Sequence, residues 1–356
     1  MTGLRKLFAL ALAVLFAGSA VVAVGFAQDP KKDEPKKDEP KKDEPKQPTP
    51  PAPAPASDKQ KFEPKFEAKK PFYQSVTTDV EQTVKVQGGN DLKLKHSQTF
   101  LFKWTPVKQE ADKWTVKLVI EGVKLRVDVA NNPVNYDSTA ENANAQNPGL
   151  NEFFKNLIGS TFTVTFGKGM AVEKVDGQDA LLRNLGAANQ QMEALLKKIL
   201  TPEALKEMSD PLAGLTPGGD KPEKGVGDKW TKVTPLKLGP IGDYERTYTF
   251  ESKGKDKEKP ELDRVEVKAT LTYKPPSGDA DGLLFRIKSG DLTTQNPKAG
   301  YYLYDPKSGW LTKSELSVTM SGTLVVAIGQ TETSVQLFQT QTTTVETKGE
   351  SFLPKK

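Results

Sequence analysis

Apolar and polar residues alternate strictly along most of the chain from residue 72 onward. The clearest run is Val265, Val267, Ala269, Leu271 and Tyr273, with polar residues between them. Alternation with period two indicates strands with one buried and one solvated face, as in antiparallel sheets. Other runs of this kind are Leu92, Leu94, Phe100, Phe102 and Trp104; Trp114, Val116, Leu118 and Ile120; Leu283, Phe285 and Ile287; and Leu316, Val318, Met320, Leu324, Val326 and Ile328.

Several of these apparent strands are long, and long twisted strands with one dry face tend to curl. We therefore predict a mainly β protein with a few helices, of the α+β class, built on a curled antiparallel sheet or half-barrel. The alternation of apolar and polar residues shifts by one position between Ile120 and Val123. This shift predicts a bulge or bend at Glu121-Gly122. Turn-forming residues join the runs at 88–91, 167–169 and 305–309.

Helical spacing of apolar residues replaces the alternation in the middle of the chain. The stripe comprises Leu181, Leu182, Leu185, Ala188, Met192, Leu195, Leu196 and Ile199. It predicts a helix that covers the dry face of the sheet, with a membrane-binding amphipathic helix as the alternative. Shorter helices are expected over 150–158 and from Thr201 onward. We expect a mobile surface loop at 131–149 and a second loop at 214–227.

The second of these loops separates two β-rich regions. The tetrapeptide Asp-Lys-Trp-Thr occurs at 112–115 and again at 228–231, each time before an apparent strand. Residues 72–356 are therefore read as one globular region, with 72–213 and 228–353 as its possible halves.

The first residues have the pattern of a secretory signal peptide, which we place at 1–27. Arg5 and Lys6 precede an apolar run, and Gly25 and Ala27 are small residues suited to cleavage after Ala27. Cleavage after Ala20 and an uncleaved membrane anchor are the alternatives. We therefore expect export to the periplasm, the cell envelope or the extracellular space, with no integral membrane span after cleavage.

Residues 28–71 are expected to form a disordered linker. Pro-Lys-Lys-Asp-Glu recurs from residue 30 to 44, and a Pro/Ala tract follows at 48–56. Such a segment has too little apolar surface to offset the conformational entropy that is lost on folding. It is either a tether or a solvated tail without a specific role.

Composition excludes several kinds of chemistry. The chain has no Cys and one His, so disulfides, a thiol nucleophile, Cys-based metal sites and multi-histidine metal sites are excluded. Lys and Arg number 51 and Asp and Glu number 46. Removing Arg5 and Lys6 lowers the net charge from +5 to +3, too little to suggest nucleic-acid binding. No cofactor is expected.

Candidate chemical groups are few. His96 is two residues from Leu94 in the alternation, so its side chain should point to the buried side of the sheet. One hypothesis is a general base that acts with Ser97, but Ser97 faces the other side of the strand. We expect His96 to be a buried, hydrogen-bonded residue, and we assign no catalytic or metal-binding residue. Asp279–Gly282 is expected to be a turn. Four aromatic residues gather around one turn, where they either pack across strands or line a pocket: Tyr301, Tyr302, Tyr304 and Trp310.

Three segments carry a resemblance to a known family: Gly227–Thr231, Tyr304–Leu311 and Gly159–Gly167. With the signal peptide and the charged tail, they resemble an uncharacterised family of exported bacterial β-rich proteins, a domain of unknown function. The resemblance covers most of residues 72–350 and implies no catalytic residue. The expected plan is also similar, in architecture alone, to periplasmic lipoprotein carriers.

Three functions stay open. The favoured hypothesis is an exported, non-catalytic protein that binds an apolar ligand or an envelope partner protein on its sheet. An apolar groove would then be lined by Phe100, Phe102, Leu118 and Phe285. The alternatives are a purely structural or interaction module on a tether, and a hydrolase with an unrecognised carboxylate site.

Overall fold

The computed structural model describes residues 59–87, 91–129, 132–140, 148–186, 205–206, 209–218, 222–237, 242–276, 286–328 and 330–355. Several predictions lie outside these residues: the signal peptide, residues 28–58 of the linker, the helical stripe after Gly186, the start of the helix at Thr201, the turn at Asp279–Gly282, and Phe285.

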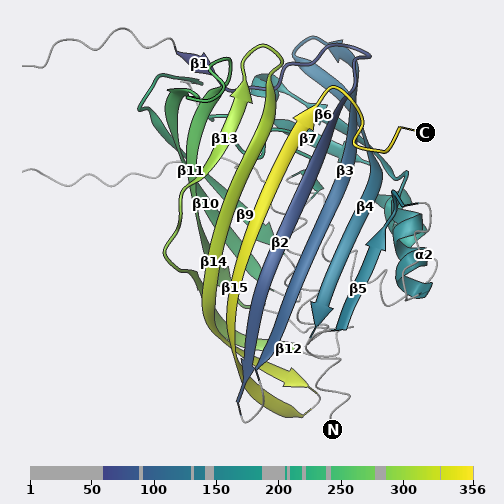
Figure 1. Cartoon of the computed structure of the whole chain (residues 1–356), viewed down its shortest axis with the longest axis vertical. Coiled ribbons are helices and arrows are strands. Elements are labelled where there is room, and N and C mark those ends of the chain that lie inside the picture. The colour runs from purple at the N-terminus through teal and green to yellow at the C-terminus, as the bar shows by residue number, and fades with distance from the viewer. Residues whose placement is uncertain are drawn as a thin grey trace, which may run out of the picture.

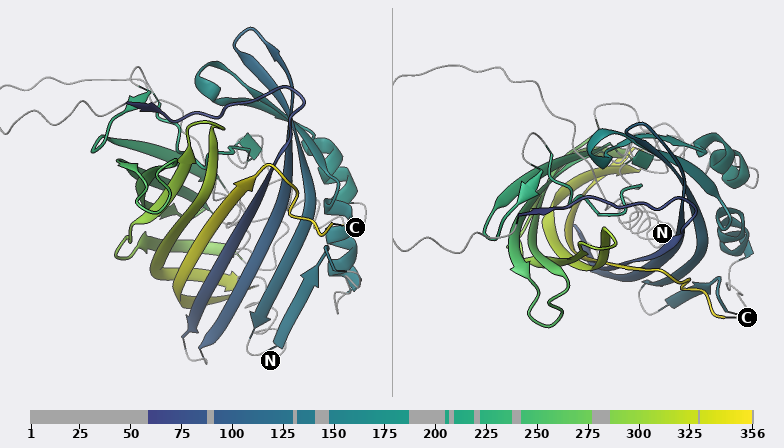
Figure 2. Two further views of the ribbon diagram at one scale, coloured as in Figure 1. Left: turned by 45° about the horizontal axis from the view of Figure 1, so that its top comes forward. Right: turned by 90° about the horizontal axis from the view of Figure 1, so that it is seen from above.

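One large antiparallel sheet makes up most of the described structure. Its spatial order is β7-β6-β4-β3-β2-β15-β14-β12-β11-β10-β9, with β13 on β11 and β14, and β5 on β4. The sheet is strongly curled, as Figures 1 and 2 show, which confirms the predicted mainly β fold with a curled antiparallel sheet. The elements are β1 Gln60–Lys61, β2 Phe72–Val86, β3 Leu92–Glu110, β4 Lys113–Val129, β5 Asn132–Asp137, α2 Pro148–Leu157, β6 Thr161–Phe166, the 3-10 helix Lys168–Met170, β7 Val172–Asp176, α3 Gln178–Gly186, β8 Glu223–Lys224, β9 Lys229–Lys237, β10 Asp243–Lys255, β11 Asp263–Lys274, β12 Arg286–Thr294, β13 Gly300–Asp305, β14 Trp310–Ile328 and β15 Thr331–Lys348.

The first long strand of the sheet lies beside the last. β2 pairs with β15 over fourteen residue pairs, from Tyr73 with Lys348 to Val86 with Val335. The two β-rich regions recognised in the sequence are therefore continuous parts of one sheet, joined at the β2–β15 seam.

The predicted bulge lies where the parity of the sequence shifts. Leu101 pairs with Gly122 and Phe102 pairs with Ile120, which leaves Glu121 as the extra residue of β4. The bulge lets Ile120 and Val123 both point to the buried face, where they are 6% and 0% exposed. The expected turns at 167–169 and 305–309 join β6 to β7 and β13 to β14.

The expected loop at 131–149 is wrong for its first part. Asn132–Asp137 forms β5, which pairs with β4, and Tyr136 is 5% exposed. The ring of Tyr136 stacks on Phe154 of α2 at 4.7 Å between centroids. The alternation of Val134 and Tyr136 is short and lies among Asn and Pro, so composition masked it. The helix expected at 150–158 is confirmed as α2, Pro148–Leu157.

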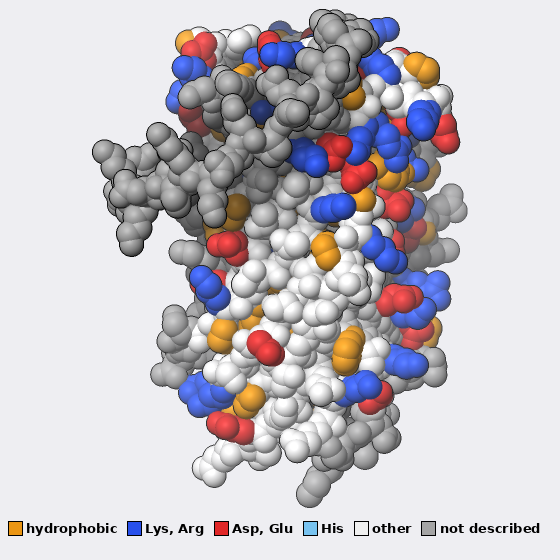
Figure 3. Space-filling view, turned by 90° about the vertical axis from the view of Figure 1, so that its left-hand side faces the viewer, with side chains coloured by type: hydrophobic (Ala, Val, Ile, Leu, Met, Phe, Trp, Pro, Cys, Tyr) orange, Lys and Arg blue, Asp and Glu red, His pale blue; other side chains and the backbone are white. Residues whose placement is uncertain are grey.

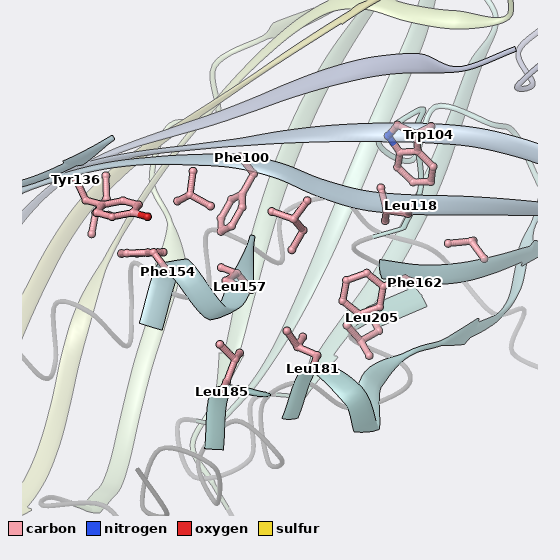
Figure 4. Packing of buried hydrophobic residues seen from close by; sticks show 14 of the residues in the cluster. Phe100, Trp104, Leu118, Tyr136, Phe154, Leu157, Phe162, Leu181, Leu185 and Leu205 are labelled. Atoms are coloured by element: carbon pink, nitrogen blue, oxygen red, sulfur yellow. The ribbon is translucent and has the colours of Figure 1, made fainter. Parts of the chain in front are cut away.

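Helices α2 and α3 cover the apolar face of β3, β4 and β6 (Figure 4). Leu181, Leu182 and Leu185 of α3 are at most 5% exposed, which confirms the start of the predicted helical stripe. Leu181 and Leu185 share one apolar cluster with residues of the sheet and of α2: Phe100, Trp104, Leu118, Phe154, Leu157 and Phe162.

A second apolar cluster lies on β9, β10, β11, β13 and β14. It is covered by residues 209–218, whose Leu212 and Leu215 are both fully buried. Trp230 Nε1 donates to the Leu215 carbonyl at 3.2 Å, and the Tyr302 hydroxyl donates to the Ala213 carbonyl at 3.1 Å. Hydrogen bonds to backbone carbonyls thus hold an irregular segment against the sheet.

Residues 59–71, here called the strap, are folded rather than part of a linker, so the predicted boundary at residue 71 is wrong. The strap crosses one end of the curled sheet, from β1 to the start of β2 (Figure 2). Phe62 is fully buried and contacts Trp230 and Tyr304, at 5.5 and 5.2 Å between ring centroids. Phe66 packs on Phe166 at 5.0 Å, so the strap connects the two apolar clusters.

The solvated face of the sheet is rich in Ser and Thr. Hydroxyl groups pair across strands, as between Thr77 and Thr99 at 2.9 Å and between Thr319 and Thr340 at 3.0 Å. On the side shown in Figure 3, hydrophobic side chains are scattered singly among uncharged and charged ones. This is the polar outer face that the alternation predicts.

Candidate functional site

His96 lies on the buried face, as its parity predicts. Its side chain is 7% exposed, and Nε2 is 3.2 Å from Gln98 Oε1. In the tautomer that donates this bond, Nδ1 has no hydrogen-bond partner. Burial lowers the pKa of His96 below its usual 6.5, so the ring is neutral at pH 7. The structure thus supports a buried, hydrogen-bonded histidine without a nucleophile beside it.

The lowered pKa of His96 gives a pH prediction. The His96 ring takes up a proton near pH 6.5 in the unfolded chain but only at lower pH in the folded chain. Protonation therefore favours the unfolded chain, so the stability that neutral His96 contributes is complete above pH 6.5 and is lost as the pH falls. Between pH 7.5 and 5.5, we expect the free energy of unfolding of the wild type to fall more than that of His96→Gln. Urea unfolding at both pH values measures this, and parallel losses would show that His96 titrates alike in both states.

The residues of the expected apolar groove are mostly covered. Phe100 and Leu118 are 8% and 4% exposed and belong to the cluster under α2 and α3, while Phe102 stacks on Phe100 at 5.8 Å. Phe285 lies outside the described residues. The aromatic group around the β13–β14 turn also packs: Tyr302 and Tyr304 are 3% and 0% exposed. Both sets thus contribute to apolar packing in the part of the chain that the structure describes.

An open cleft of about 470 Å³ lies between the strap and two hairpins, and we call it the strap cleft. Its volume lies within the range of about 300–1,000 Å³ that is typical of ligand sites. Three distant segments form it: residues 61–66 of the strap, residues 109–114 around the β3–β4 turn, and residues 167–170 after β6.

Aromatic rings and charges of both signs line the strap cleft. Phe66 and Trp114 meet edge to face at 5.7 Å between centroids, and both are partly exposed. Glu63 pairs with Lys61 at 2.7 Å, whereas Asp112 and Lys168 are exposed and have no ion pair among the described residues. The cleft therefore offers an apolar contact flanked by a free carboxylate and a free ammonium group.

The backbone around the strap cleft is held in specific conformations. Gly169 and Met170 have φ of 67° and 60°, a region that favours glycine. The Gly167 carbonyl accepts from the Met170 amide at 3.0 Å, and the Gly167 amide donates to the Ala171 carbonyl at 2.8 Å. Sequence reasoning identified this turn as a hairpin but had no signal that would bring it beside Trp114 and the strap.

Polar side chains interrupt the buried face at the β2–β15 seam. Gln82 and Gln339 are directly paired across the seam and are 3% and 1% exposed. The amide nitrogen and oxygen of both have no hydrogen-bond partner. Gln74, on the same face of β2, is 4% exposed but donates to the Pro211 carbonyl at 2.9 Å and to Thr347 Oγ1 at 3.2 Å.

These glutamines give a matched stability prediction. Burying a polar group without a partner is costly, and replacing it with an apolar group of similar shape is neutral or stabilising. We expect the double variant Gln82→Met and Gln339→Met to unfold with an unchanged free energy or one raised by up to about 2 kcal/mol. Gln74→Met should lower it by about 1–3 kcal/mol, because its two acceptors lose their donor. Chemical denaturation measures both, and equal losses in the two variants would contradict the expectation.

The fold defines a mainly β protein that is built on one large curled antiparallel sheet. Residues 111–311, more than half of the chain, match the model of a family of unknown function (DUF6263). The chain therefore belongs to this family, which confirms the expected resemblance to an uncharacterised domain. No curated protein matches the chain.

Solved structures give weak likenesses. A chain from "Lipid-protein interactions in lipovitellin" has 9% identity and a TM-score of 0.38 over 82% of this chain, which spans 27% of that one. DynF from the dynemicin biosynthesis pathway of Micromonospora chersina has 8% identity and a TM-score of 0.19, covering 82% of this chain and 85% of that one. The COG4313 outer membrane channel from Pseudomonas putida F1 has 7% identity and a TM-score of 0.21, covering 81% and 98%. All three TM-scores are below 0.5, so these likenesses assign no function, and the likeness to lipoprotein carriers stays a prediction.

Two properties of the described residues bear on the candidate sites. No helix among them is long and apolar enough to cross a membrane. Within the same part of the chain, no three His, Asp or Glu side chains gather in a way that could hold a metal ion.

Proposed function

We propose that this member of the family is an exported, non-catalytic binding protein that takes up a segment of a partner protein in the strap cleft. The observation that carries this proposal is the cleft itself, an open space of about 470 Å³ with Phe66 and Trp114 in its lining. The two apolar clusters of the sheet are covered in the described residues by α2, α3, residues 209–218 and the strap. The strap cleft is open, and this favours the partner-protein form of the hypothesis over the apolar-ligand form.

The chemistry of the cleft indicates the kind of segment. An apolar or aromatic anchor would contact Phe66 and Trp114, and aromatic anchors dominate the energies of many interfaces. A basic residue beside the anchor would meet Asp112, and an acidic one would meet Lys168, both on the cleft lining. Such rim charges contribute more to specificity and association rate than to affinity.

The position of the strap cleft fits a tethered module. The cleft lies beside the strap, which begins at Lys59, directly after the charged Pro-rich segment of residues 28–58. If that segment is an extended tether, it places the cleft near the attachment point of the folded region.

Export is the first step of this proposal. N-terminal sequencing of the protein from producing cells should give Gln28 as the first residue, because we place signal-peptide cleavage after Ala27. An intact Met1 in the membrane fraction would contradict export with cleavage.

Selection from a library of displayed decapeptides tests the binding proposal. We expect the folded protein to enrich peptides with one large apolar residue flanked by charged residues. Trp114→Ala should abolish the enrichment, whereas the control Gln336→Ala, at an exposed position on the far end of β15, should retain it. Equal enrichment with both variants would overturn the strap cleft as the binding site.

A further inference from the structure

The two copies of the tetrapeptide Asp-Lys-Trp-Thr have the same environment in the sheet. Trp114 and Trp230 are the second residues of β4 and β9. Each pairs directly across the sheet with a Phe, Trp114 with Phe166 of β6 and Trp230 with Phe250 of β10. Both of these neighbouring strands have the pattern Thr-x-Thr-Phe. Sequence and strand pairing together therefore indicate a repeated unit.

The strap carries a repeat of its own, and it matches the two copies. The triplet Lys-Phe-Glu occurs twice between residues 61 and 67. Phe62 stacks on Trp230 at 5.5 Å between ring centroids, and Phe66 meets Trp114 edge to face at 5.7 Å. Each Phe of the strap thus contacts the Trp of one copy.

Residues of the same chain cover the second copy. Trp230 is 8% exposed, its Nε1 donates to the Leu215 carbonyl, and Lys224 Nζ lies over its ring, 6.0 Å from the centroid. That distance is within the range of a cation–π interaction. The Asp228 carboxylate accepts from the Gly225 amide at 2.8 Å. In this copy, a backbone carbonyl and a cation contact the Trp, and a backbone amide contacts the Asp.

The first copy has the same residue types without this cover. Trp114 is partly exposed, and its Nε1 has no acceptor among the described residues. Asp112 is exposed and, in the same part of the chain, forms no ion pair. Both residues line the strap cleft. The Trp and the Asp that the second copy covers with its own chain are therefore part of the wall of an open cleft in the first copy.

The lysine of each copy is already paired with a glutamate. Lys113 Nζ is 2.6 Å from Glu173 Oε2, and Lys229 Nζ is 3.4 Å from Glu251 Oε2. The lysine of the first copy is thus paired elsewhere than with Asp112. The negative charge of Asp112 is therefore available to a basic group that enters the cleft.

We propose that the segment bound in the strap cleft makes, at Trp114, the contacts that residues 215 and 224–225 make at the second copy. A Lys or Arg of that segment lies over the Trp114 ring beside Asp112, and a backbone carbonyl of the segment accepts from Trp114 Nε1. Trp is the aromatic side chain that attracts a cation most strongly. This inference rests on the proposed function and narrows the partner to a protein with a basic residue in an extended segment.

Three displayed decapeptide libraries test this inference, with Lys, Met or Glu fixed at the central position and the other positions random. Met has about the length of Lys without its charge. We expect the folded protein to enrich the Lys library about fivefold or more over the other two. Equal enrichment of the Lys and Met libraries, or preference for Glu, would overturn this inference and leave the strap cleft as a binding site. No enrichment from these or from a fully random library would overturn the proposed function itself.

The same substitution in the two copies separates binding from folding. Trp114→Phe keeps an aromatic ring but removes the Nε1 donor and weakens the attraction for a cation, so enrichment of the Lys library should fall about fivefold or more. Trp230→Phe is the matched control: it should lower the melting temperature, because the Leu215 carbonyl loses its donor, and keep the enrichment. If Trp230→Phe does not fold, Asp228→Ala takes its place, with the same expectation. Full enrichment with Trp114→Phe, or an equal loss of enrichment in the control, would overturn the assignment.

Discussion

Truncating the chain to begin at Phe72 should remove most of its stability, whereas truncation to Lys59 should leave the melting temperature unchanged. The difference between the two chains is the strap, whose Phe62 is fully buried against Trp230 and Tyr304. Losing a buried Phe costs about 3–5 kcal/mol, a large share of the roughly 5–15 kcal/mol that stabilises a typical protein.

Point variants make the same test without changing chain length. Phe62→Ala should lower the free energy of unfolding by about 3–5 kcal/mol, and Phe62→Leu by clearly less, because it keeps most of the apolar volume. Lys59→Ala, at an exposed position of the same segment, is the control. Melting and urea unfolding measure these effects, and a Phe72 truncation as stable as the Lys59 truncation would show that the strap does not contribute to the fold.

The second large effect is expected at Leu185. This side chain of α3 is 3% exposed and belongs to the cluster that covers β3, β4 and β6 (Figure 4). Leu185→Ala leaves a cavity in that cluster and should cost about 2–5 kcal/mol. Val226→Ala, at a position that is 57% exposed, should change stability by less than about 0.5 kcal/mol.

An equal effect of Leu185→Ala and Val226→Ala on urea unfolding would mean that α3 does not pack on the sheet as described. Leu195 belongs to the same predicted helical stripe and lies outside the described residues.

Local pattern was enough to predict the sheet, because side-chain direction in a strand depends on parity alone. The bulge at Glu121 shows this most clearly, since a one-residue shift in the alternation is visible without knowing the partner strand. The antiparallel pairing of β2 with β15, by contrast, could not be predicted from local pattern. Residues more than 240 positions apart meet there, and no local pattern specifies which strands become neighbours.

The composition of residues 28–71, taken as a whole, gave a wrong prediction for residues 59–71. Phe62 and Phe66 are four residues apart in a stretch of Lys, Glu and Pro, and the surrounding charge made that stretch read as linker. Two Phe residues in a charged segment indicate that the segment packs against the folded region. In the same way, Asn and Pro around Val134 and Tyr136 concealed β5.

The candidate sites could not be predicted from local sequence. The strap cleft needs residues 61–66, 109–114 and 167–170 to converge, and each segment alone is an ordinary turn or extended stretch. His96 was the residue most open to a catalytic interpretation, and its burial beside Gln98 could be anticipated from parity. Unpartnered groups such as Tyr244 Oη and the Gln82–Gln339 pair become visible only when burial and hydrogen bonding are known together.

Site-specific photo-crosslinking in producing cells tests the central claim, that a partner protein binds in the strap cleft, most directly. A photoreactive residue replaces Lys168, which is exposed on the cleft lining, or Gln336, which is exposed near the far end of the β2–β15 seam. We expect a discrete crosslinked product from position 168 that disappears when Trp114→Ala is added, and none from position 336. Crosslinking from position 168 that survives Trp114→Ala, or equal products from both positions, would contradict it.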